Sequence, residues 1–296
     1  MTEFLQQLLN GLSLGAIYAL IALGYTMVYG VLRFINFAHS DIFMVGAYVG
    51  YYLGRLVPEG TLWGGILVLL AAMLGCALLG IVIERLAYRP LRHAPTLNVL
   101  ITAIGVSLLL EYSGQRLFGA ASRTFPAVFP VAHFSLGGLV LSTNQLLVII
   151  VAVLLMLGLQ FVVHRTRIGT AMRAVSLNPQ AAQLVGVNND VVITFTFGLG
   201  SALAAAGGIL YSLNYPSIDP LMGVMPGLKA FVAAVLGGIG NLPGAALGGL
   251  LLGTVETFVG GSQWSTYKDA IAFTILIAIL LFRPAGLLGR FTVEKV

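Results

Sequence analysis

Three carboxylates lie within apolar stretches of this sequence, at Asp41, Glu111 and Glu256. An ionisable side chain inside a membrane span costs free energy, so such residues mark the paths of solutes or ions by default. Asp41 and Glu111 fall near the ends of predicted spans, and Glu256 lies about one turn from the end of its run. An ion-coupled secondary transporter, or a channel for small polar solutes, is therefore one open function.

Several catalytic and nucleotide-binding patterns are missing from the sequence. A phosphate-binding loop of the GxxxxGK[ST] type needs a Gly-Lys pair, and the sequence contains none. The four histidines show neither HExxH nor another ligand pair at helical spacing. The single Cys76 cannot form a CxxC metal or redox pair. These absences predict a protein that is not an enzyme and holds no metal or cofactor.

The stretch SLNPQAAQLVGVNND, residues 176–190, is a polar segment between two long apolar runs. Asn178 is a favoured N-cap residue, and Pro179 suits the first helical position. Gly186 suits the position just past a helix end. The spacing therefore predicts a helix of about two turns over residues 179–185.

This short helix has one apolar face. Ala181, Leu184 and Val185 recur at i, i+3 and i+4, whereas Gln180 and Gln183 point elsewhere. A helix this short is marginal by itself in water. We therefore expect it either to lie against the membrane surface or to dock onto a cytoplasmic partner.

Composition predicts an all-α polytopic membrane protein with a single transmembrane domain over residues 1–296. Of the residues, 58% are hydrophobic and 8% are charged, against roughly a quarter charged in soluble domains. The fifteen basic residues are spread among short loops rather than gathered on one face, which argues against nucleic-acid binding.

Runs of about 20 apolar residues, the length that crosses a bilayer, place the spans. A run at 38–57 begins with polar residues, and two shorter runs between 224 and 260 are joined by GGIGNLPG, as two spans or a re-entrant pair. We predict eight or nine segments in all. The clearest are 9–31, 62–83, 97–117, 144–163, 191–213 and 266–282.

Basic residues in the connections predict the orientation, because cytoplasmic loops carry more Lys and Arg. Ten fall on one side and five on the other, which places the N-terminus outside and the C-terminus in the cytoplasm. The segment 164–190 is then a cytoplasmic loop. The ten are Arg33, Arg85, Arg89, Arg92, Arg165, Arg167, Arg173, Arg283, Arg290 and Lys295, and the five are Arg55, Arg116, Arg123, Lys229 and Lys268.

Glycines at a spacing of four predict close helix packing in lipid. Gly11 with Gly15, Gly46 with Gly50, and Gly249 with Gly253 show this spacing. The glycines assigned to helix packing in and after the GGIGNLPG cluster are Gly237, Gly238, Gly240, Gly244 and Gly248.

Five separated blocks resemble the permeases of branched-chain amino acid ABC importers, in particular the H-type subunit of the leucine, isoleucine and valine system. The resemblance covers nearly the whole chain. The blocks are GLSLGAIYALIALGYTMVYGVLRFINFAHSDIFMVGAY, IERLAYRPLR, NPQAAQLVGVN, KAFVAAVLGGIGNLPGAALGGLLLG and RPAGLLGR.

The resemblance implies a subunit of the bacterial inner membrane that translocates branched-chain or other neutral amino acids. It implies a second related permease, two cytoplasmic ATPase subunits that bind the ATP, and a periplasmic substrate-binding protein. The fold would be similar to that of the ribose and vitamin B12 importer permeases, surrounded by membrane lipid.

The resemblance also assigns roles to individual residues. The segment 178–186 is similar to the coupling helix that enters a cleft on the ATPase, with Asn178, Pro179, Ala181, Ala182, Leu184, Val185 and Gly186 as its residues. A translocation path between the two permeases would be lined by polar residues of otherwise apolar spans. These are Asn36, His39, Asp41 and Asn214, for which helix capping or interhelical hydrogen bonding stays open as the alternative.

The resemblance is incomplete at one block. Many members of the family read NFAHGE where this sequence reads NFAHSD, so that Ser40 and Asp41 stand in place of Gly and Glu. Serine lacks the backbone freedom of glycine, and aspartate keeps the charge with a shorter reach.

Overall fold

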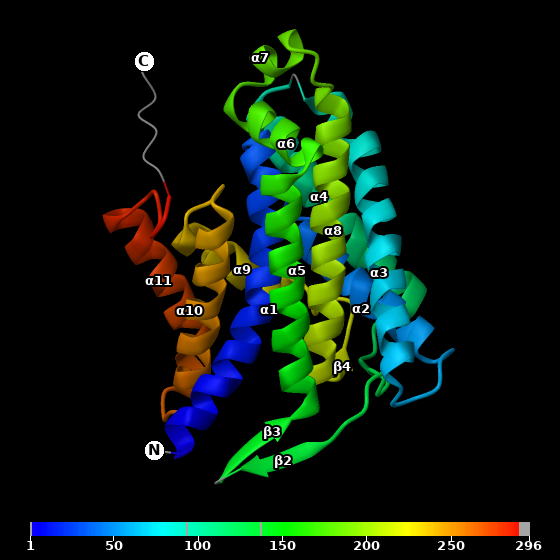
Figure 1. The fold of residues 1–296 in the computed structure, drawn as a ribbon, viewed down its shortest axis with the longest axis vertical. Coiled ribbons are helices and arrows are strands. Elements are labelled where there is room, and N and C mark those ends of the chain that lie inside the picture. Colours follow the sequence, from blue (N-terminus) through cyan, green and yellow to red (C-terminus); the bar gives the residue numbers. More distant parts are fainter. Residues whose placement is uncertain (1, 93, 137, 290–296) are drawn as a thin grey trace.

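The apolar runs of the sequence form helices that lie side by side along the long axis of the molecule (Figure 1). The structure, a computed structural model, describes residues 2–92, 94–136 and 138–289. Its α-helices are α1 (Thr2–Leu32), α2 (His39–Gly54), α3 (Leu62–Ile83), α4 (Thr96–Phe118), α5 (Thr143–Arg165), α6 (Arg167–Leu177), α7 (Pro179–Leu184), α8 (Asn189–Asn214), α9 (Val224–Gly237), α10 (Leu242–Gly260) and α11 (Lys268–Phe282).

Within the described part of the chain, seven helices are long and apolar enough to cross a membrane. They contain α1, α3, α4, α5, α8, α10 and α11, and the bounds of these α-helices agree with the predicted spans to within two residues at most ends. The exception is α1, which begins at Thr2 rather than near residue 9. The chain is therefore a multi-pass membrane protein.

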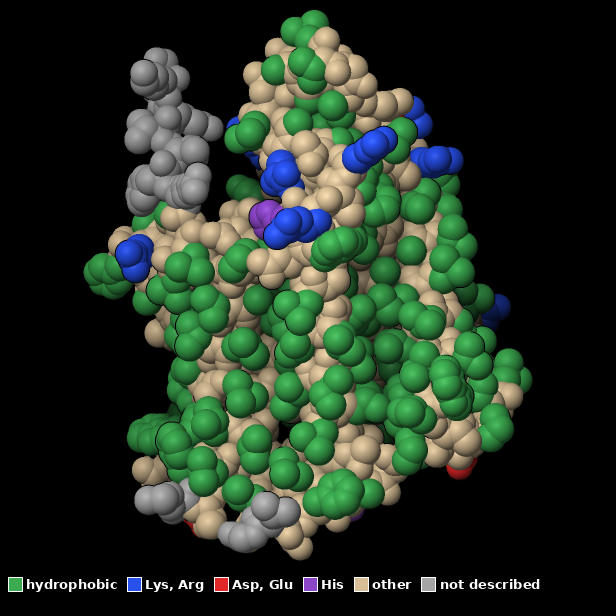
Figure 2. All heavy atoms as spheres, viewed as in Figure 1, with side chains coloured by type: hydrophobic (Ala, Val, Ile, Leu, Met, Phe, Trp, Pro, Cys, Tyr) green, Lys and Arg blue, Asp and Glu red, His purple; other side chains and the backbone are tan. Residues whose placement is uncertain are grey.

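The centre of the bundle is formed by α1 and α8, which are buried over most of their length. Helix α10 packs along α1, and α3 packs along α8. The outer helices α4, α5 and α11 expose mainly apolar side chains. Figure 2 shows a broad hydrophobic surface on the face where α5 and α11 lie. Lipid tails are as apolar as leucine, so this surface is stable in a bilayer without further burial.

Helices α2 and α9, of 16 and 14 residues, are much shorter than the central helices α1 and α8, and both begin inside the bundle. His39, the first residue of α2, contacts Gly24, which is eight residues before the end of α1. At about 1.5 Å per residue, α2 thus begins roughly 12 Å below that end. Gly227 in the first turn of α9 packs against Ser40 in the first turn of α2. Two half-length helices therefore meet with their N-termini at mid-depth. Because these helices are short, the apolar runs at 38–57 and 224–260 were difficult to assign as spans from the sequence.

Glycine pairs let the central helices approach closely, as the spacing predicts. A Cβ on Gly11 would lie 2.8 Å from the Thr254 Cα, and one on Gly15 would lie 2.8 Å from the Leu250 Cα. Gly253 in turn packs against Gly15. These contacts hold α1 against α10.

The GGIGNLPG cluster contains glycines with two different roles. Gly237 packs against Gly244, and Gly248 packs against Ala233, so these three glycines bring α9 and α10 together as predicted. Gly238 and Gly240 instead lie in the connecting turn with φ of +103° and +93°, a region that favours glycine. The prediction that Gly238 and Gly240 serve in helix packing was wrong. These two glycines allow the backbone conformation of the turn between α9 and α10.

Two short sheets depart from a purely helical fold. Strands β2 (His133–Leu136) and β3 (Leu139–Ser142) form an antiparallel hairpin, and β1 (Arg123–Thr124) pairs with β4 (Ser217–Ile218). Gln6 in α1 exchanges two hydrogen bonds with the backbone of Val140, which ties the hairpin to the start of the chain.

The bundle has two distinct ends, here called the α7 end and the hairpin end. Figure 2 shows Lys and Arg side chains gathered towards the α7 end. Of the ten basic residues predicted for one side, eight lie at helix ends or connections of the α7 end, while Arg290 and Lys295 fall outside the described residues. The prediction that Lys229 lies in a connection between spans was wrong. Lys229 lies within α9, and its side chain is buried.

Candidate functional site

Helix α7 is built as its sequence predicts. The Asn178 side chain caps it by accepting hydrogen bonds from the backbone N–H groups of Gln180 and Ala181, both at 3.0 Å. Gly186 follows the helix with φ of +86°. The helix ends at Leu184, one residue before the predicted end. It projects beyond the long helices at the tip of the molecule (Figure 1).

The apolar face of α7 is uncovered. Leu184 is 89% exposed and Val185 is 78% exposed, and Ala181 is exposed beside them. Ala182 points the other way and is buried against its own chain. The exposed apolar face of α7 therefore consists of Ala181, Leu184 and Val185, and Ala182 packs beneath it.

Helix α7 is tied to the start of α8. The Asn189 side chain donates a hydrogen bond to the Pro179 carbonyl at 3.0 Å, and the Val187 N–H donates to the Ala182 carbonyl at 3.0 Å. Asn188 caps α8 through its side-chain oxygen. Helix α7 is therefore connected directly to α8, which runs through the centre of the bundle.

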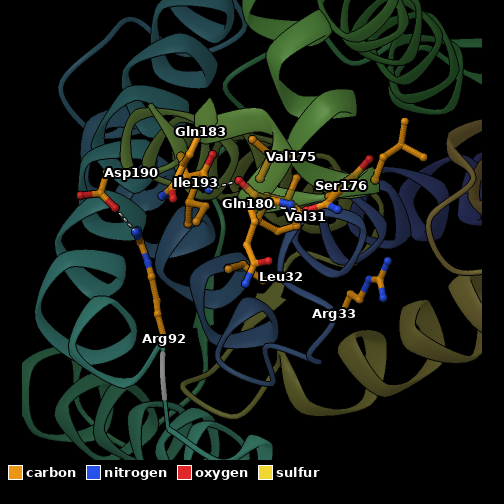
Figure 3. A pocket seen from close by; sticks show the side chains of 14 residues that line it. Val31, Leu32, Arg33, Arg92, Val175, Ser176, Gln180, Gln183, Asp190 and Ile193 are labelled. Atoms are coloured by element: carbon orange, nitrogen blue, oxygen red, sulfur yellow. Dashed lines mark hydrogen bonds and ion pairs between the residues drawn. The ribbon is translucent and has the colours of Figure 1, made fainter. Parts of the chain in front are cut away.

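A cavity of about 530 Å³ lies between α7 and the bundle (Figure 3). Arg33 enters from the end of α1, and Arg92 points at Asp190 from the opposite wall. Gln180 and Gln183 of α7 face the same cavity. This space separates α7 from the end of α1.

An ion-pair network lies at the same end. Glu84 is fully buried and accepts hydrogen bonds from Arg92 and, at 2.8 Å, from the Thr194 hydroxyl. Asp190 forms ion pairs with both Arg89 and Arg92. The network joins the turn after α3 to the first two turns of α8. Sequence reasoning missed it, because its partners are about a hundred residues apart.

Two of the four predicted path residues make polar contacts between helices near the start of α2. Asn36 is buried and accepts a hydrogen bond from the Tyr88 hydroxyl at 2.5 Å. Asp41 is 1% exposed and accepts one from the Ser107 hydroxyl of α4 at 2.5 Å. The prediction that Asp41 lies near the end of a span was wrong. Because α2 begins at mid-depth, the Asp41 carboxylate does not reach the membrane interface.

The other two path residues lie in different surroundings. Asn214 donates a hydrogen bond to the Ser13 hydroxyl at 3.0 Å, near the hairpin end. His39 is buried between α1 and α8, where its ring packs edge-on against Tyr25 and no described group bonds its Nε2 atom. The structure therefore brings Asn36, His39 and Asp41 together and leaves Asn214 apart.

A second buried charge cluster joins α9, α10 and α11. The Lys229 ammonium contacts carboxylate oxygens of Glu256 and Asp269, each at 2.6 Å. The Tyr18 hydroxyl of α1 donates to Glu256 at 2.9 Å. Glu256 does not extend to solvent as its position in the sequence suggests, because a buried cation lies next to it.

The letters GLSLG at residues 11–15 fit the spacing of the GxSxG hydrolase motif. That motif acts at a sharp turn between a strand and a helix. Here all five residues lie inside α1, where Ser13 accepts the hydrogen bond from Asn214. The serine is a packing residue of a membrane helix.

Known proteins resemble this chain over nearly its full length. It is 44% identical to the high-affinity branched-chain amino acid transport system permease protein BraD of Pseudomonas aeruginosa, over 99% of this chain and 98% of that protein. It is 42% identical to the corresponding protein LivH of Escherichia coli K12, with the same coverage.

An archaeal protein extends the similarity. The chain is 31% identical to the probable branched-chain amino acid transport permease protein LivH of Methanocaldococcus jannaschii, over 91% of this chain and 88% of that protein. The family described as branched-chain amino acid transport system / permease component matches residues 7–280. The chain belongs to this family of transport permeases.

Proposed function

We propose that the chain is the permease subunit of an ATP-driven importer for branched-chain amino acids in a bacterial inner membrane. A second permease, two cytoplasmic ATPase subunits and a periplasmic binding protein complete the transporter. The observation that carries the proposal is α7, a capped and anchored helix whose apolar face is exposed at the basic end of the bundle. An ATPase that covers this face would supply the energy for transport.

The orientation follows from the same end of the molecule. Basic residues gather at the α7 end, and cytoplasmic ends of membrane proteins carry more Lys and Arg. We therefore place α7 and the C-terminus in the cytoplasm and the N-terminus outside. Counting α2 and α9 with the segments that lead into them, the chain crosses nine times.

Helix α7 is proposed as the coupling helix of residues 178–186. Movement of an attached ATPase would displace α7, and the Asn189–Pro179 hydrogen bond would pass the displacement to α8. The Glu84–Arg92–Asp190 network would carry it to the end of α3. The helix bundle would then rock as a rigid body between outward and inward openings.

The translocation path is proposed to lie between the two permeases. Asn36, His39 and Asp41 are gathered where α2 begins, at mid-depth, which is where the half-length helices of many transporters form substrate sites. Asn214 would lie nearer the outer mouth.

Energy coupling tests the proposal directly. Leucine uptake by vesicles that hold the complete transporter should require ATP and should continue when an uncoupler collapses the proton gradient. Uptake that stops with the uncoupler while the ATP concentration is held constant would contradict an ATP-driven importer. That result would favour an ion-coupled secondary transporter.

Cysteine labelling tests the orientation. In intact cells, a membrane-impermeant maleimide should label Ser122→Cys, beside Arg123, and should leave Arg85→Cys unlabelled until the membrane is opened. The native Cys76 is buried and gives a low background. Labelling of Arg85→Cys in intact cells would reverse the assignment of the two ends.

A further inference from the structure

A second cavity lies where the first turns of α2 and α9 meet, beside α4. Its volume is about 190 Å³, and it opens at the surface of the subunit. One part of its lining is polar, formed by Tyr25, Ser40, Ser107 and Glu111. The remainder is apolar and consists of Phe37, Ile104, Leu108, Val224 and Leu228.

Glu111 is the charged group of this cavity. It lies within the membrane-crossing helix α4, seven residues before the end at Phe118, or roughly 10 Å at 1.5 Å per residue. Among the described residues, none forms an ion pair or a hydrogen bond with it. A carboxylate inside the membrane costs free energy unless a group of opposite charge lies next to it. The cavity therefore favours a cationic ligand.

The neighbouring polar atoms point to the same chemistry. The Ser107 hydroxyl donates its hydrogen to Asp41 at 2.5 Å, and the Ser40 hydroxyl donates to the Phe37 carbonyl at 2.8 Å. Both serine oxygens are therefore left to the cavity as hydrogen-bond acceptors. The Asp41 carboxylate behind Ser107 adds a second negative charge. An ammonium group, which has three donors and no acceptor, matches this end.

The apolar wall suits the rest of such a ligand. Leu108, Val224 and Leu228 come from two helices and face the cavity together with Phe37. A branched aliphatic side chain would be buried against them, and each buried methylene is favourable by roughly 0.8 kcal/mol. No Lys or Arg lines the cavity, so a ligand's carboxylate would point to the open side.

We propose that this cavity holds the transported amino acid during its passage, with Glu111 as the ligand of its ammonium group. The aliphatic side chain lies on Leu108, Val224 and Leu228, and the carboxylate faces the second permease across the open side. The inference rests on the proposed function, because it assigns substrate contacts within the proposed path. It adds Glu111 to the path and gives Asp41 a supporting role through Ser107.

The test uses a thiol placed in the apolar wall. In membranes that hold the complete transporter, Leu108→Cys is labelled with N-ethylmaleimide with and without a ligand at millimolar concentration. The ligands are leucine, 3-methylbutylamine and 4-methylpentanoate. The amine keeps the branched chain and the ammonium group and lacks the carboxylate, whereas 4-methylpentanoate keeps the branched chain and the carboxylate and lacks the ammonium group. We expect leucine and the amine to slow labelling at least threefold, and 4-methylpentanoate to leave the rate unchanged.

A second variant identifies the ammonium ligand. Adding Glu111→Gln to Leu108→Cys should abolish protection by the amine, whereas Glu111→Asp should retain part of it. Leu97→Cys, exposed on the same helix away from the cavity, is the labelling control and should be protected by none of the three ligands. Tyr112→Phe, also exposed on α4, controls for substitution in this helix and should leave protection intact.

Two results would overturn the assignment. Absence of protection by leucine in Leu108→Cys would show that the cavity is not occupied by substrate. Protection by the amine that survives Glu111→Gln would remove Glu111 as its ligand. Neither result bears on energy coupling, which the dependence of uptake on ATP decides separately. If Glu111→Gln does not reach the membrane, the Glu111→Asp variant with the amine and with 4-methylpentanoate still distinguishes recognition of the ammonium group from recognition of the carboxylate.

Discussion

Replacing Leu184 by glutamate should release the ATPase subunits while the permease stays in the membrane. Leu184 is 89% exposed at the tip of α7, so the substitution does not disturb the fold of the subunit. In the docked complex the new carboxylate would be buried without a partner, which costs several kcal/mol. At about 1.4 kcal/mol for each factor of ten, association should weaken at least roughly a hundredfold. Co-purification of the ATPases and their titration onto the purified permease both measure this loss.

The Gln180→Ala change is the matched control. Gln180 lies in the same helix but faces the cavity beneath α7 rather than the exposed face, so its removal should leave association nearly unchanged. Ala182→Glu is a poor test, because Ala182 is buried and a charge there would disrupt α7 itself. If the Leu184→Glu permease still bound its ATPases and transported normally, the contact would have to lie elsewhere, for example on the segment 84–96.

Replacing Lys229 by methionine should destabilise the subunit by about 3–5 kcal/mol, the usual cost of removing one partner from a buried ion pair. Methionine fills a similar volume but leaves Glu256 and Asp269 without their cation. Glu256 would keep only the hydrogen bond from Tyr18. The temperature at which the purified transporter loses its native elution profile in detergent should fall clearly below that of the parent.

A double substitution separates charge from packing. Lys229→Met combined with Glu256→Gln should recover part of the lost stability, because the amide needs no counter-ion. Such coupling between contacting residues is what a double-mutant cycle measures. Lys268→Met changes an exposed lysine at the start of α11 and should have little effect. Equal stability of Lys229→Met and the parent, or no recovery in the double variant, would contradict a stabilising role for the cluster.

The candidate site was only partly predictable from the sequence. The cap of Asn178 and the turn at Gly186 act on neighbouring residues, so their identity is enough to predict α7. The sequence did not predict that the Ala182 side chain points inward, because its orientation depends on how the loop folds back onto α8. Likewise, Glu111 has the same sequence signal as any carboxylate near a span end, and only its place beside α2 and α9 gives it a cavity.

The sequence by itself determined the class of protein, most span boundaries, α7 with its caps and the glycine pairs that allow close helix packing, although not which helices those glycines bring together. Each of these depends on hydropathy, capping or spacing over at most about 25 neighbouring residues. Only the tertiary structure decided that α2 and α9 begin at mid-depth and that Lys229 is buried against Glu256. It alone also decided that Glu84, Arg92 and Asp190 form one network. Those features depend on contacts between distant segments, and the free energy of a buried charge is set by the partner that the fold brings to it.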